Sequence, residues 1–576
     1  MGNSSEHSDP SLLRRHSEPE TAPNQARQRG FPANGRVSFD PGTRFLAGVN
    51  GSTVLLGGSP LRLLTLTGKS AAVVAALAEG ASASEAASAA ATSVKSTNGL
   101  MDRLLDAQLV HPLWPSTSIT EIEENPLSTV TLVIPVKDRE VQLRRLLMSV
   151  QREMSEGLSV VVVDDGSTDD SGNVAREFGA TVLRHEQSLG PAGARNRGLE
   201  AVTTPFVAFV DSDCTCTYGW LSLLLQHFAD PSVALVAPRI FGEVSLHATP
   251  EPVRRGTGHF ESSSVAPVNI SDVDPIHPAV AKSSTAVGPA GSSALDAYES
   301  VRSPLDLGPE QALIVPRTRV SYVTSAALLA RTDVLRALSG FSTELHVGED
   351  VDLLWRLHAA GWRSRYEPRA TVAHDHRVAW RAFAKRRYQY GSSAALLDAR
   401  HPGQVAPLAV SGWSALGWLG LCTLSPVGVV GGLGIMAVTT ALLPRKLSAV
   451  ANPRRLALDL AGRGHLGAGR QLASATWRAY LPLAVLSALL PKPLGAIGRR
   501  ILIASALIPN VAEWRSKRPK LDPIRYVGIR LLDDGAYCAG VWSGALKLRS
   551  FRALKPDFSS WPGKGQATKS TSPPAP

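Results

Sequence analysis

Two aspartates one residue apart, Asp211 and Asp213, follow the apolar run "PFVAFV". The β-branched and aromatic residues of that run predict a strand buried on both faces, with the two carboxylates at its carboxyl end. Ligands of open α/β sheets bind at that end of the strands. Two carboxylates there can hold a divalent cation, although they could also form a simple polar turn. Cys214 and Cys216 have no second pair at zinc-ligand spacing, so we interpret them as core or turn residues.

Two further stretches carry side chains that could do chemistry. The segment "GEDVDLLWRLHAAG" predicts a helix with Glu349 and Asp350 in its first turn, where the helix dipole favours negative charge. Stabilisation of the helix start is one interpretation of this pair, and catalysis is the other. The segment "EPRATVAHDHR" predicts a strand with His374 and His376 on one face, because residues two apart in a strand point the same way.

The region that must position these residues alternates strands and helices. Strands are predicted at "TLVIPV", "SVVVVDD", "ATVLRH" and "PFVAFVDSD", with helices over residues 140–154 and 172–178. This order implies right-handed βαβ units, and therefore an α/β fold with a mainly parallel sheet. Over residues 242–297 the composition turns to Ser, Pro, Ala, Gly and Val without periodicity, which predicts a mobile insertion.

The amino-terminal part has a different pattern. Residues 1–35 are polar and predict a disordered tail, and a second tail is predicted at residues 556–576. Over residues 42–115, an Asn-Gly pair at position 50 separates two apolar runs, which indicates a hairpin, and three helical segments follow. We interpret this as a small winged-helix-like domain with too few charges to bind DNA. It resembles the peptide-clamp domain found beside enzymes that modify ribosomally made peptides.

The carboxyl-terminal part is apolar. Residues 405–443 contain no charged side chain, and this length allows two passes through a membrane with Ser425-Pro426 as the turn. Arg400 on one side and Arg445 and Lys446 on the other predict a transmembrane hairpin with both ends in the cytosol. Residues 444–555 hold shorter apolar pieces, which predict a membrane-associated helical region made of interfacial helices or further crossings.

The overall charge narrows the class of partner. The 576 residues carry a formal net charge of +11, but the basic residues are scattered. No basic helix with interleaved aromatic residues is present, so a membrane surface fits better than nucleic acid. Four cysteines without a pattern, together with the lack of an export signal, predict residence on the cytosolic side.

Four motifs occur in one order within the α/β region, namely "IPVKDR", "VVVVDDGSTDD", "GPAGARNRG" and "VDSD". On these motifs, residues 129–395 resemble the family 2 inverting glycosyltransferases, which have a Rossmann-like, nucleotide-sugar-binding GT-A fold. The resemblance implies UDP-glucose as the donor and Mg²⁺ or Mn²⁺ as the cofactor. The residues that it implies for donor binding are Pro135, Asp138, Asp164, Asp165, Arg195 and Asp211.

The same resemblance assigns a metal site and a general base. Asp213 matches the family's main metal ligand, and His374, or as second choice His376, completes the site. Asp350 matches the general base, with Glu349 beside it as the other catalytic carboxylate.

Two positions depart from the family pattern. Lys137 stands where relatives frequently have an aromatic residue over the uracil. The segment "RRYQYG" from Arg386 is not the Gln-x-x-Arg-Trp signature of processive cellulose-like synthases. The chain therefore need not make a long polymer.

The order of the three regions also resembles the mycofactocin-system glycosyltransferases, with "RSPLDLG" and "VGEDVDLLWRL" as further matching pieces. That resemblance implies transfer of glucose from UDP-glucose to premycofactocin, a redox cofactor made from a ribosomal peptide, and its extension as a β-linked oligosaccharide. It implies a place at the cell membrane with the catalytic domain on the cytoplasmic side. The alternative is a membrane glycosyltransferase acting on a polyprenyl-linked cell-wall glycan, because such an enzyme would share every catalytic motif.

Overall fold

The computed structural model describes residues 32, 34–114, 125–242, 294–375 and 379–558. Nearly all of the two expected tails lies outside the described residues, as do His376 and most of the expected insertion at 242–297. The last residues of that insertion, from Ala294, belong to a helix, α9 (Ala294–Arg302), so this end of the segment is ordered.

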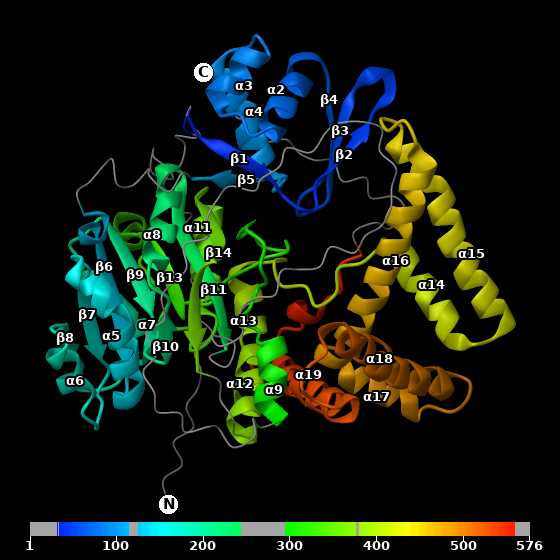
Figure 1. The fold of residues 1–576 in the computed structure, drawn as a ribbon. Helices are drawn as coiled ribbons and strands as arrows, with labels where there is room; N and C mark the ends of the chain where they lie inside the picture. The colour runs from blue at the N-terminus through cyan, green and yellow to red at the C-terminus, as the bar shows by residue number, and fades with distance from the viewer. Residues whose placement is uncertain (1–31, 33, 115–124, 243–293, 376–378, 559–576) are drawn as a thin grey trace, which may run out of the picture.

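The amino-terminal domain combines short strands with three helices (Figure 1). Asn50 and Gly51 turn the chain between β2 and β3 with φ angles of 56° and 72°, the left-handed conformation that an Asn-Gly turn supplies. Side chains such as Leu55 and Leu104 form its core. The expected hairpin and three helices are therefore present, with an added strand pair, β1–β5. The elements are β1 (Arg36–Phe39), β2 (Arg44–Ala47), β3 (Thr53–Gly57), β4 (Arg62–Leu66), α2 (Gly68–Ala78), α3 (Ala83–Ala89), α4 (Val94–Asp106) and β5 (Val110–Leu113).

The second domain is built on a nine-stranded sheet in the order β10-β14-β11-β13-β9-β6-β7-β8, with β12 paired to β14. Strands β8, β7, β6 and β9 are parallel, as the βαβ pattern predicts. The rest is mixed, because β13 runs antiparallel to β9 and β11, and β10 antiparallel to β14. Strand bounds are β6 (Val130–Val136), β7 (Ser159–Asp164), β8 (Thr181–Arg184), β9 (Phe206–Val210), β10 (Cys214–Cys216), β11 (Val233–Gly242), β12 (Ala312–Leu313), β13 (Ala327–Arg331) and β14 (Arg363–His374).

Helices cover both faces of this sheet. Leu147 of α5 and Trp220 of α8 pack into the core on one face, while Leu199 of α7 and Leu353 of α11 pack into the core on the other. The two cores fix the strand ends that carry the expected site residues. Helix bounds are α5 (Glu140–Ser155), α6 (Ser171–Glu177), α7 (Gly190–Ala201), α8 (Trp220–Leu225), α10 (Thr332–Ala337) and α11 (Glu349–Ala359).

The rest of the chain is helical, and two of its helices pack with backbones in contact. A Cβ on Gly391 of α12 would lie 2.0 Å from the carbonyl oxygen of Tyr537 in α19, and one on Gly540 would lie 2.0 Å from that of Tyr388. Glycine at both positions allows this approach. Helix bounds are α12 (Trp380–Ser392), α13 (Ala394–Arg400), α14 (Gly412–Thr423), α15 (Pro426–Leu442), α16 (Pro453–Arg478), α17 (Leu481–Leu489), α18 (Leu494–Lys517) and α19 (Pro523–Lys547).

Helices α14 and α15 form a hairpin that turns at Leu424, but its arms are unequal. With 12 residues, α14 is about 18 Å long, which is shorter than the roughly 30 Å of a bilayer hydrocarbon core. Among the described residues, the helices long and apolar enough to cross a membrane are Pro426–Leu447 and Leu494–Lys517, with a third span if α16 and α17, bent by 87°, count as one. The expected pair of full spans within residues 405–443 is therefore corrected to one, because α14 begins only at Gly412.

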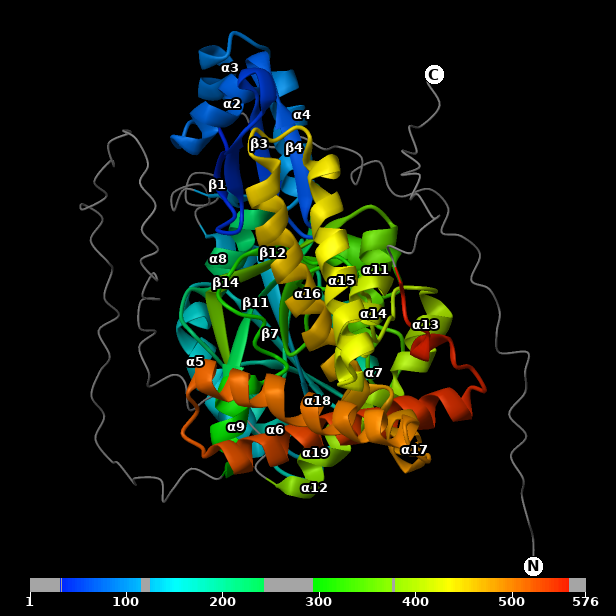
Figure 2. The ribbon, with the colours of Figure 1, turned by 90° about the vertical axis from the view of Figure 1, so that its right-hand side faces the viewer.

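The amino-terminal sheet is paired with the carboxyl-terminal region. The backbone N–H of Val49 donates to Ala449 O at 3.0 Å, and that of Ala451 donates to Ala47 O at 2.9 Å. The end of β2 and the residues that follow it are thus paired with the segment that precedes α16. From there α16 runs to the α17–α19 cluster (Figures 1 and 2).

Candidate active site

Pro135 and Asp164 lie on the neighbouring parallel strands β6 and β7. Pro135 stands beyond Val133, the last β6 residue paired with β9, so its missing N–H costs no hydrogen bond on that side. Asp164, at the end of β7, accepts a hydrogen bond from Ser167 N at 2.8 Å and is ion-paired with Arg184. Both residues lie toward the carboxyl ends of their strands, as the sequence predicts.

Asp138 joins the loops that follow β6 and β7. It has a φ of 51° and accepts a hydrogen bond from Thr168 N at 2.7 Å. That bond and a second one from the Thr168 hydroxyl lower the pKa of Asp138. The side chain is exposed, so it stays ionised at the rim of the strand ends.

Asp165 organises the loop between β8 and α7. Its carboxylate accepts hydrogen bonds from Ser188 Oγ at 2.6 Å, Leu189 N at 2.8 Å and Gly190 N at 2.9 Å, and shares one with His185 Nδ1 at 2.7 Å. Burial raises the pKa of Asp165, but these hydrogen bonds together outweigh burial and hold the pKa below its usual value. Asp165 is therefore an ionised group that shapes the loop.

A buried arginine links the end of β9 to the start of α11. Arg195, in α7, is 2% exposed, and its Nη2 donates to Asp211 Oδ1 at 2.5 Å while its Nη1 donates to Glu349 Oε1 at 3.1 Å. Burial lowers the pKa of Arg195, but the two carboxylates outweigh burial and raise it. In this structure the guanidinium holds two of the site carboxylates in place.

Asp213 and His374 come together where β10 pairs with β14. His374 Nε2 lies 3.5 Å from Asp213 Oδ1, and Arg139 Nη1 lies 2.9 Å from Asp213 Oδ2. His374 Nδ1 is buried and has no hydrogen-bond partner among the described residues. A carboxylate and an imidazole fit Mn²⁺ or Mg²⁺, with phosphate and water oxygens as the remaining ligands. Within the part of the chain that the structure describes, no group of three or more acidic, His or Cys side chains forms a metal site, and His376 lies outside that part.

Glu349 and Asp350 open α11 after Gly348, whose φ of 90° favours glycine. Asp350 accepts hydrogen bonds from Val351 N at 2.8 Å and from Ser325 N at 3.2 Å. Burial raises the pKa of Asp350. Burial, and then the charge of Asp350, raise the pKa of Glu349 to about 7. The pair therefore holds a proton more tightly than ordinary carboxylates do, which makes it suited to general base work near neutral pH.

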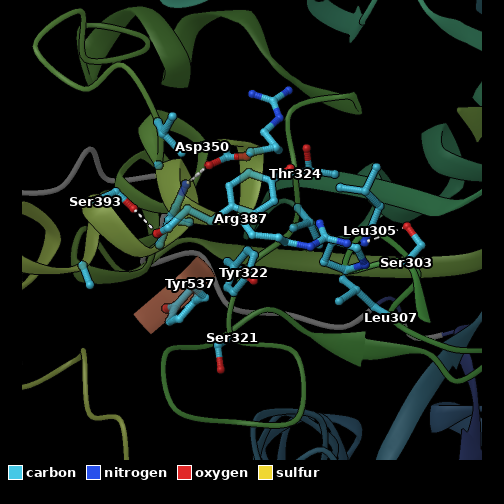
Figure 3. A pocket seen from close by; sticks show the side chains of 18 of the residues that line it. Ser303, Leu305, Leu307, Ser321, Tyr322, Thr324, Asp350, Arg387, Ser393 and Tyr537 are labelled. Carbon is cyan, nitrogen blue, oxygen red and sulfur yellow. Dashed lines mark hydrogen bonds between the residues drawn. The ribbon is translucent and has the colours of Figure 1, made fainter. Parts of the chain in front are cut away.

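Two adjoining cavities lie among the site residues. Asp350 borders a cavity of about 750 Å³ (Figure 3), and Asp211 and His374 border a smaller one beside it. Asp350 and His374 thus border neighbouring cavities that share several lining residues. Residues that line both cavities include Ser303, Pro304, Leu305, Arg386, Arg387 and Tyr390.

Part of the larger cavity comes from the carboxyl-terminal helices, and this part could not be predicted from the sequence. Arg478 of α16 and Tyr537 of α19 line it, and neither stands in a recognisable motif. They reach the cavity through the packing of helices that are distant in sequence. Arg386 and Tyr390, by contrast, stand four residues apart on one helix, a spacing visible in "RRYQYG".

Comparison with known proteins agrees with this geometry. The profile described as glycosyl transferase family 2 matches residues 131–266, and that of glycosyl transferase family group 2 matches residues 315–457. These matches span the strand ends and α11. Together with the mixed sheet, they define a family 2 glycosyltransferase with a GT-A fold.

A more complete match is pre-mycofactocin glycosyltransferase of Mycobacterium tuberculosis, which is 38% identical over 517 residues, covering 88% of this chain and 94% of that protein. The chain belongs to the family of the pre-mycofactocin glycosyltransferases. The glycosyltransferase GlyA of Streptococcus pneumoniae is 38% identical over 15% of this chain and 13% of its own length. Among solved structures, a mannosyltransferase from Pyrobaculum calidifontis in complex with GDP-Man and Mn²⁺ has 18% identity, covering 66% of this chain and 87% of its own, with a TM-score of 0.32.

Proposed function

We propose that this protein transfers glucose from UDP-glucose to premycofactocin and extends the product as a β-linked oligosaccharide. The observation that carries the proposal is the 38% identity over 88% of the chain to a pre-mycofactocin glycosyltransferase. Two features of the site support it. A carboxylate that can act as a base borders one cavity, and the adjoining cavity is bordered by His374, which with Asp213 can hold a metal.

Asp213 and His374 are the residues that would hold Mg²⁺ or Mn²⁺. The ion, when bound, supplies positive charge that stabilises the diphosphate as it leaves. Arg139, at 2.9 Å from Asp213, neutralises the same carboxylate from the side of α5. Asp138, Asp164 and Asp165 keep the loops around the nucleotide in one arrangement through the hydrogen bonds described above.

Asp350 is the general base of the proposed mechanism. It accepts the proton of the acceptor hydroxyl while that oxygen attacks the anomeric carbon, opposite the leaving group, so that an α-linked donor gives a β-glycoside. Its two backbone hydrogen bonds orient the carboxylate, and its raised pKa increases its basicity. Glu349 and Arg195 position the start of α11 relative to β9.

The remaining regions serve acceptor delivery in this proposal. Apolar helices such as α15 attach the protein to the cytoplasmic face of the cell membrane. The amino-terminal domain holds the peptide-derived acceptor or a partner protein. Removal of residues 1–115 is therefore expected to raise the KM for the acceptor, with hydrolysis of UDP-glucose as the control for folding.

The test of the function uses the full-length protein in detergent micelles with Mn²⁺ and UDP-glucose. Synthetic premycofactocin and a polyprenyl phosphate sugar are offered in parallel, and products are read by mass spectrometry and by the proton coupling of the anomeric centre. We expect hexose additions of β configuration on premycofactocin. Transfer to the polyprenyl acceptor alone, or an α-configured product, contradicts the proposal.

A further inference from the structure

Three tyrosines from different elements lie in the cavity of the proposed base. Tyr322 precedes β13, Tyr390 lies in α12 and Tyr537 lies in α19, and all three line the cavity that Asp350 borders. Figure 3 shows Tyr322 and Tyr537 close to one another, with Asp350 in the same cavity. The carboxyl-terminal region thus contributes directly to the space beside the base.

The hydroxyls of these tyrosines are available to a ligand. Within the described residues, no side chain or backbone group forms a hydrogen bond with the hydroxyl of Tyr322, Tyr390 or Tyr537. Tyr322 is 43% exposed because its ring faces the cavity, yet burial by the surrounding protein, and then the neighbouring Tyr537, raise its pKa to about 12. Tyr322 therefore remains a neutral hydroxyl that can both donate and accept.

The position of Tyr537 is fixed by its neighbours. The guanidinium of Arg478 lies 4.0 Å from the centroid of the Tyr537 ring, and Arg478 in turn donates to Asp534 Oδ1 at 2.9 Å. The contact of Gly391 with the Tyr537 backbone sets its distance from α12. A ring held in this way loses little conformational entropy when a ligand binds.

A saccharide ring is the ligand that fits these groups. A sugar offers an apolar C–H face to aromatic rings and hydroxyls at its edge, and tyrosine combines an apolar ring with a polar tip. The cavity volume of about 750 Å³ lies in the upper part of the range of about 300–1,000 Å³ for ligand pockets. That is enough for an acceptor that already carries a sugar.

We propose that Tyr322, Tyr390 and Tyr537 form a platform that binds the terminal sugar of an already glycosylated acceptor, so that α19 determines specificity for elongation. The inference rests on the proposed function and deepens it. In elongation a hydroxyl oxygen of the platform-bound sugar forms the new bond to the anomeric carbon of the donor. The bond from that carbon to UDP breaks, its electron pair leaves with UDP, and the hydroxyl proton passes to Asp350.

The test compares two acceptors, premycofactocin and p-nitrophenyl β-glucoside, with the full-length protein and UDP-glucose. In Tyr537→Ala we expect the KM for the glucoside to rise at least tenfold, kcat to change less than threefold, and products to become shorter by mass spectrometry. Tyr537→Phe keeps the ring and loses one hydrogen bond, so its KM rises by roughly two- to tenfold. We expect the KM for premycofactocin to rise less than the KM for the glucoside in both variants.

The control is Tyr388→Phe in α12. The Tyr388 hydroxyl shares a hydrogen bond with Ser543 Oγ at 2.6 Å, and Tyr388 does not line the cavity. Loss of this hydroxyl should therefore leave the KM for both acceptors unchanged. If Tyr537→Ala hydrolyses UDP-glucose normally and elongates the glucoside with unchanged KM, or weakens both transfers equally, the platform is refuted while the proposed function stands. If the wild type elongates the glucoside but not premycofactocin, and Tyr537→Ala abolishes that elongation, the proposed function fails and the platform stands.

Discussion

Arg195 and the Glu349–Asp350 pair form a buried unit with one cation and two acids at the centre of the site. Burial disfavours the charged form of each carboxyl group, and Arg195 compensates for part of that cost. Glu349 can therefore change its protonation near neutral pH. Two consequences can be measured at the level of single residues.

Asp350→Asn removes the base and keeps its size. We expect turnover to fall by about 10²–10⁴-fold, since this is the usual contribution of a positioned general base, while affinity for UDP-glucose stays within a factor of two or three. Steady-state rates and calorimetric titration of the donor measure the two quantities. Glu349→Gln is the matched control, and a larger loss of turnover in Glu349→Gln than in Asp350→Asn means that the base has been assigned to the wrong carboxylate.

The pH dependence follows from the raised pKa values. A base must be ionised, and burial raises the pKa of Asp350, so kcat/KM should begin to fall with decreasing pH at a higher pH than it would for an ordinary aspartate. In Glu349→Gln, which lacks the neighbouring carboxylate, this fall in kcat/KM should move to lower pH. The contribution of Glu349 to folding stability depends on pH in the opposite direction. The folded pKa of Glu349 lies above its ordinary value of 4.5, so its contribution is complete below about pH 4.5 and is lost as the pH rises through 7. Thermal unfolding of the wild type and of Glu349→Gln at pH 5 and pH 8 measures this change in stability.

Asp213→Ala tests the metal-binding pair. Without this carboxylate only His374 remains of the two groups, so Mn²⁺ should no longer strengthen UDP binding, and turnover should become insensitive to chelator because it is already lost. Calorimetric titration of UDP with and without Mn²⁺ measures the effect. Full activity of Asp213→Ala in excess chelator refutes the role of the pair.

Much of this residue-level arrangement could be predicted, because it depends on strand ends. Asp213 and His374 are separated by 161 positions in the sequence, yet each stands at a strand boundary of one sheet, and β10–β14 pairing brings them within 3.5 Å. The engagement of Arg195 could not be predicted. Its two carboxylate partners lie just after β9 and at the start of α11, and only packing of α7 against the sheet decides that its guanidinium points inward.

At the scale of elements, the contact between α12 and α19 joins the catalytic domain to the carboxyl-terminal helices. Their closest approach depends on glycines and not on large apolar side chains. Such contacts have no periodic signature in the sequence, which is why the sequence predicts apolar helices there but not their partner. The same reasoning explains why Tyr537 could not be foreseen as a cavity residue.

Gly540→Ala and Gly535→Ala measure that contact within one helix. A Cβ at Gly540 would lie 2.0 Å from the Tyr388 carbonyl, whereas one at Gly535 meets nothing within 4 Å. We expect Gly540→Ala to destabilise the protein by about 1–3 kcal/mol through overpacking, and Gly535→Ala to be neutral or to stabilise it by about 0.5–1 kcal/mol. Thermal unfolding in detergent measures both, and equal effects of the two substitutions contradict close packing of α12 against α19.

At the scale of the whole molecule, the amino-terminal domain bridges the other two parts. Arg363 of β14 lies 2.8 Å from Asp106 Oδ1 and 3.2 Å from Asp102 Oδ1, both on α4, while β2 pairs with the segment before α16. Changes in composition along the sequence predict three regions. Their docking could not be predicted, because it depends on a few contacts between residues hundreds of positions apart.

Membrane attachment is also a property of the whole molecule. Val430 in α15 is 70% exposed, and we expect a hydrocarbon environment around it. A charge in such a place costs about 2.5–3.5 kcal/mol, so Val430→Asp should shift protein from the membrane fraction to the soluble fraction, whereas Leu61→Asp, at a 59% exposed position of the amino-terminal domain, should not. Recovery of the unaltered protein wholly in the soluble fraction without detergent contradicts the expectation.

The pairing of β2 with the segment before α16 also orders events during synthesis. Arg44 and Asp459, which form an ion pair at 2.5 Å beside this contact, are 415 residues apart. At about 5–20 residues per second, the ribosome needs roughly 20–80 s to make the second partner after the first. During that interval the edge of β2 is open, and α14 and α15 emerge before Ala449 does. The hairpin is therefore available to the membrane before the amino-terminal sheet can close, and a chain interrupted before residue 449 keeps an open strand edge that can pair with other chains.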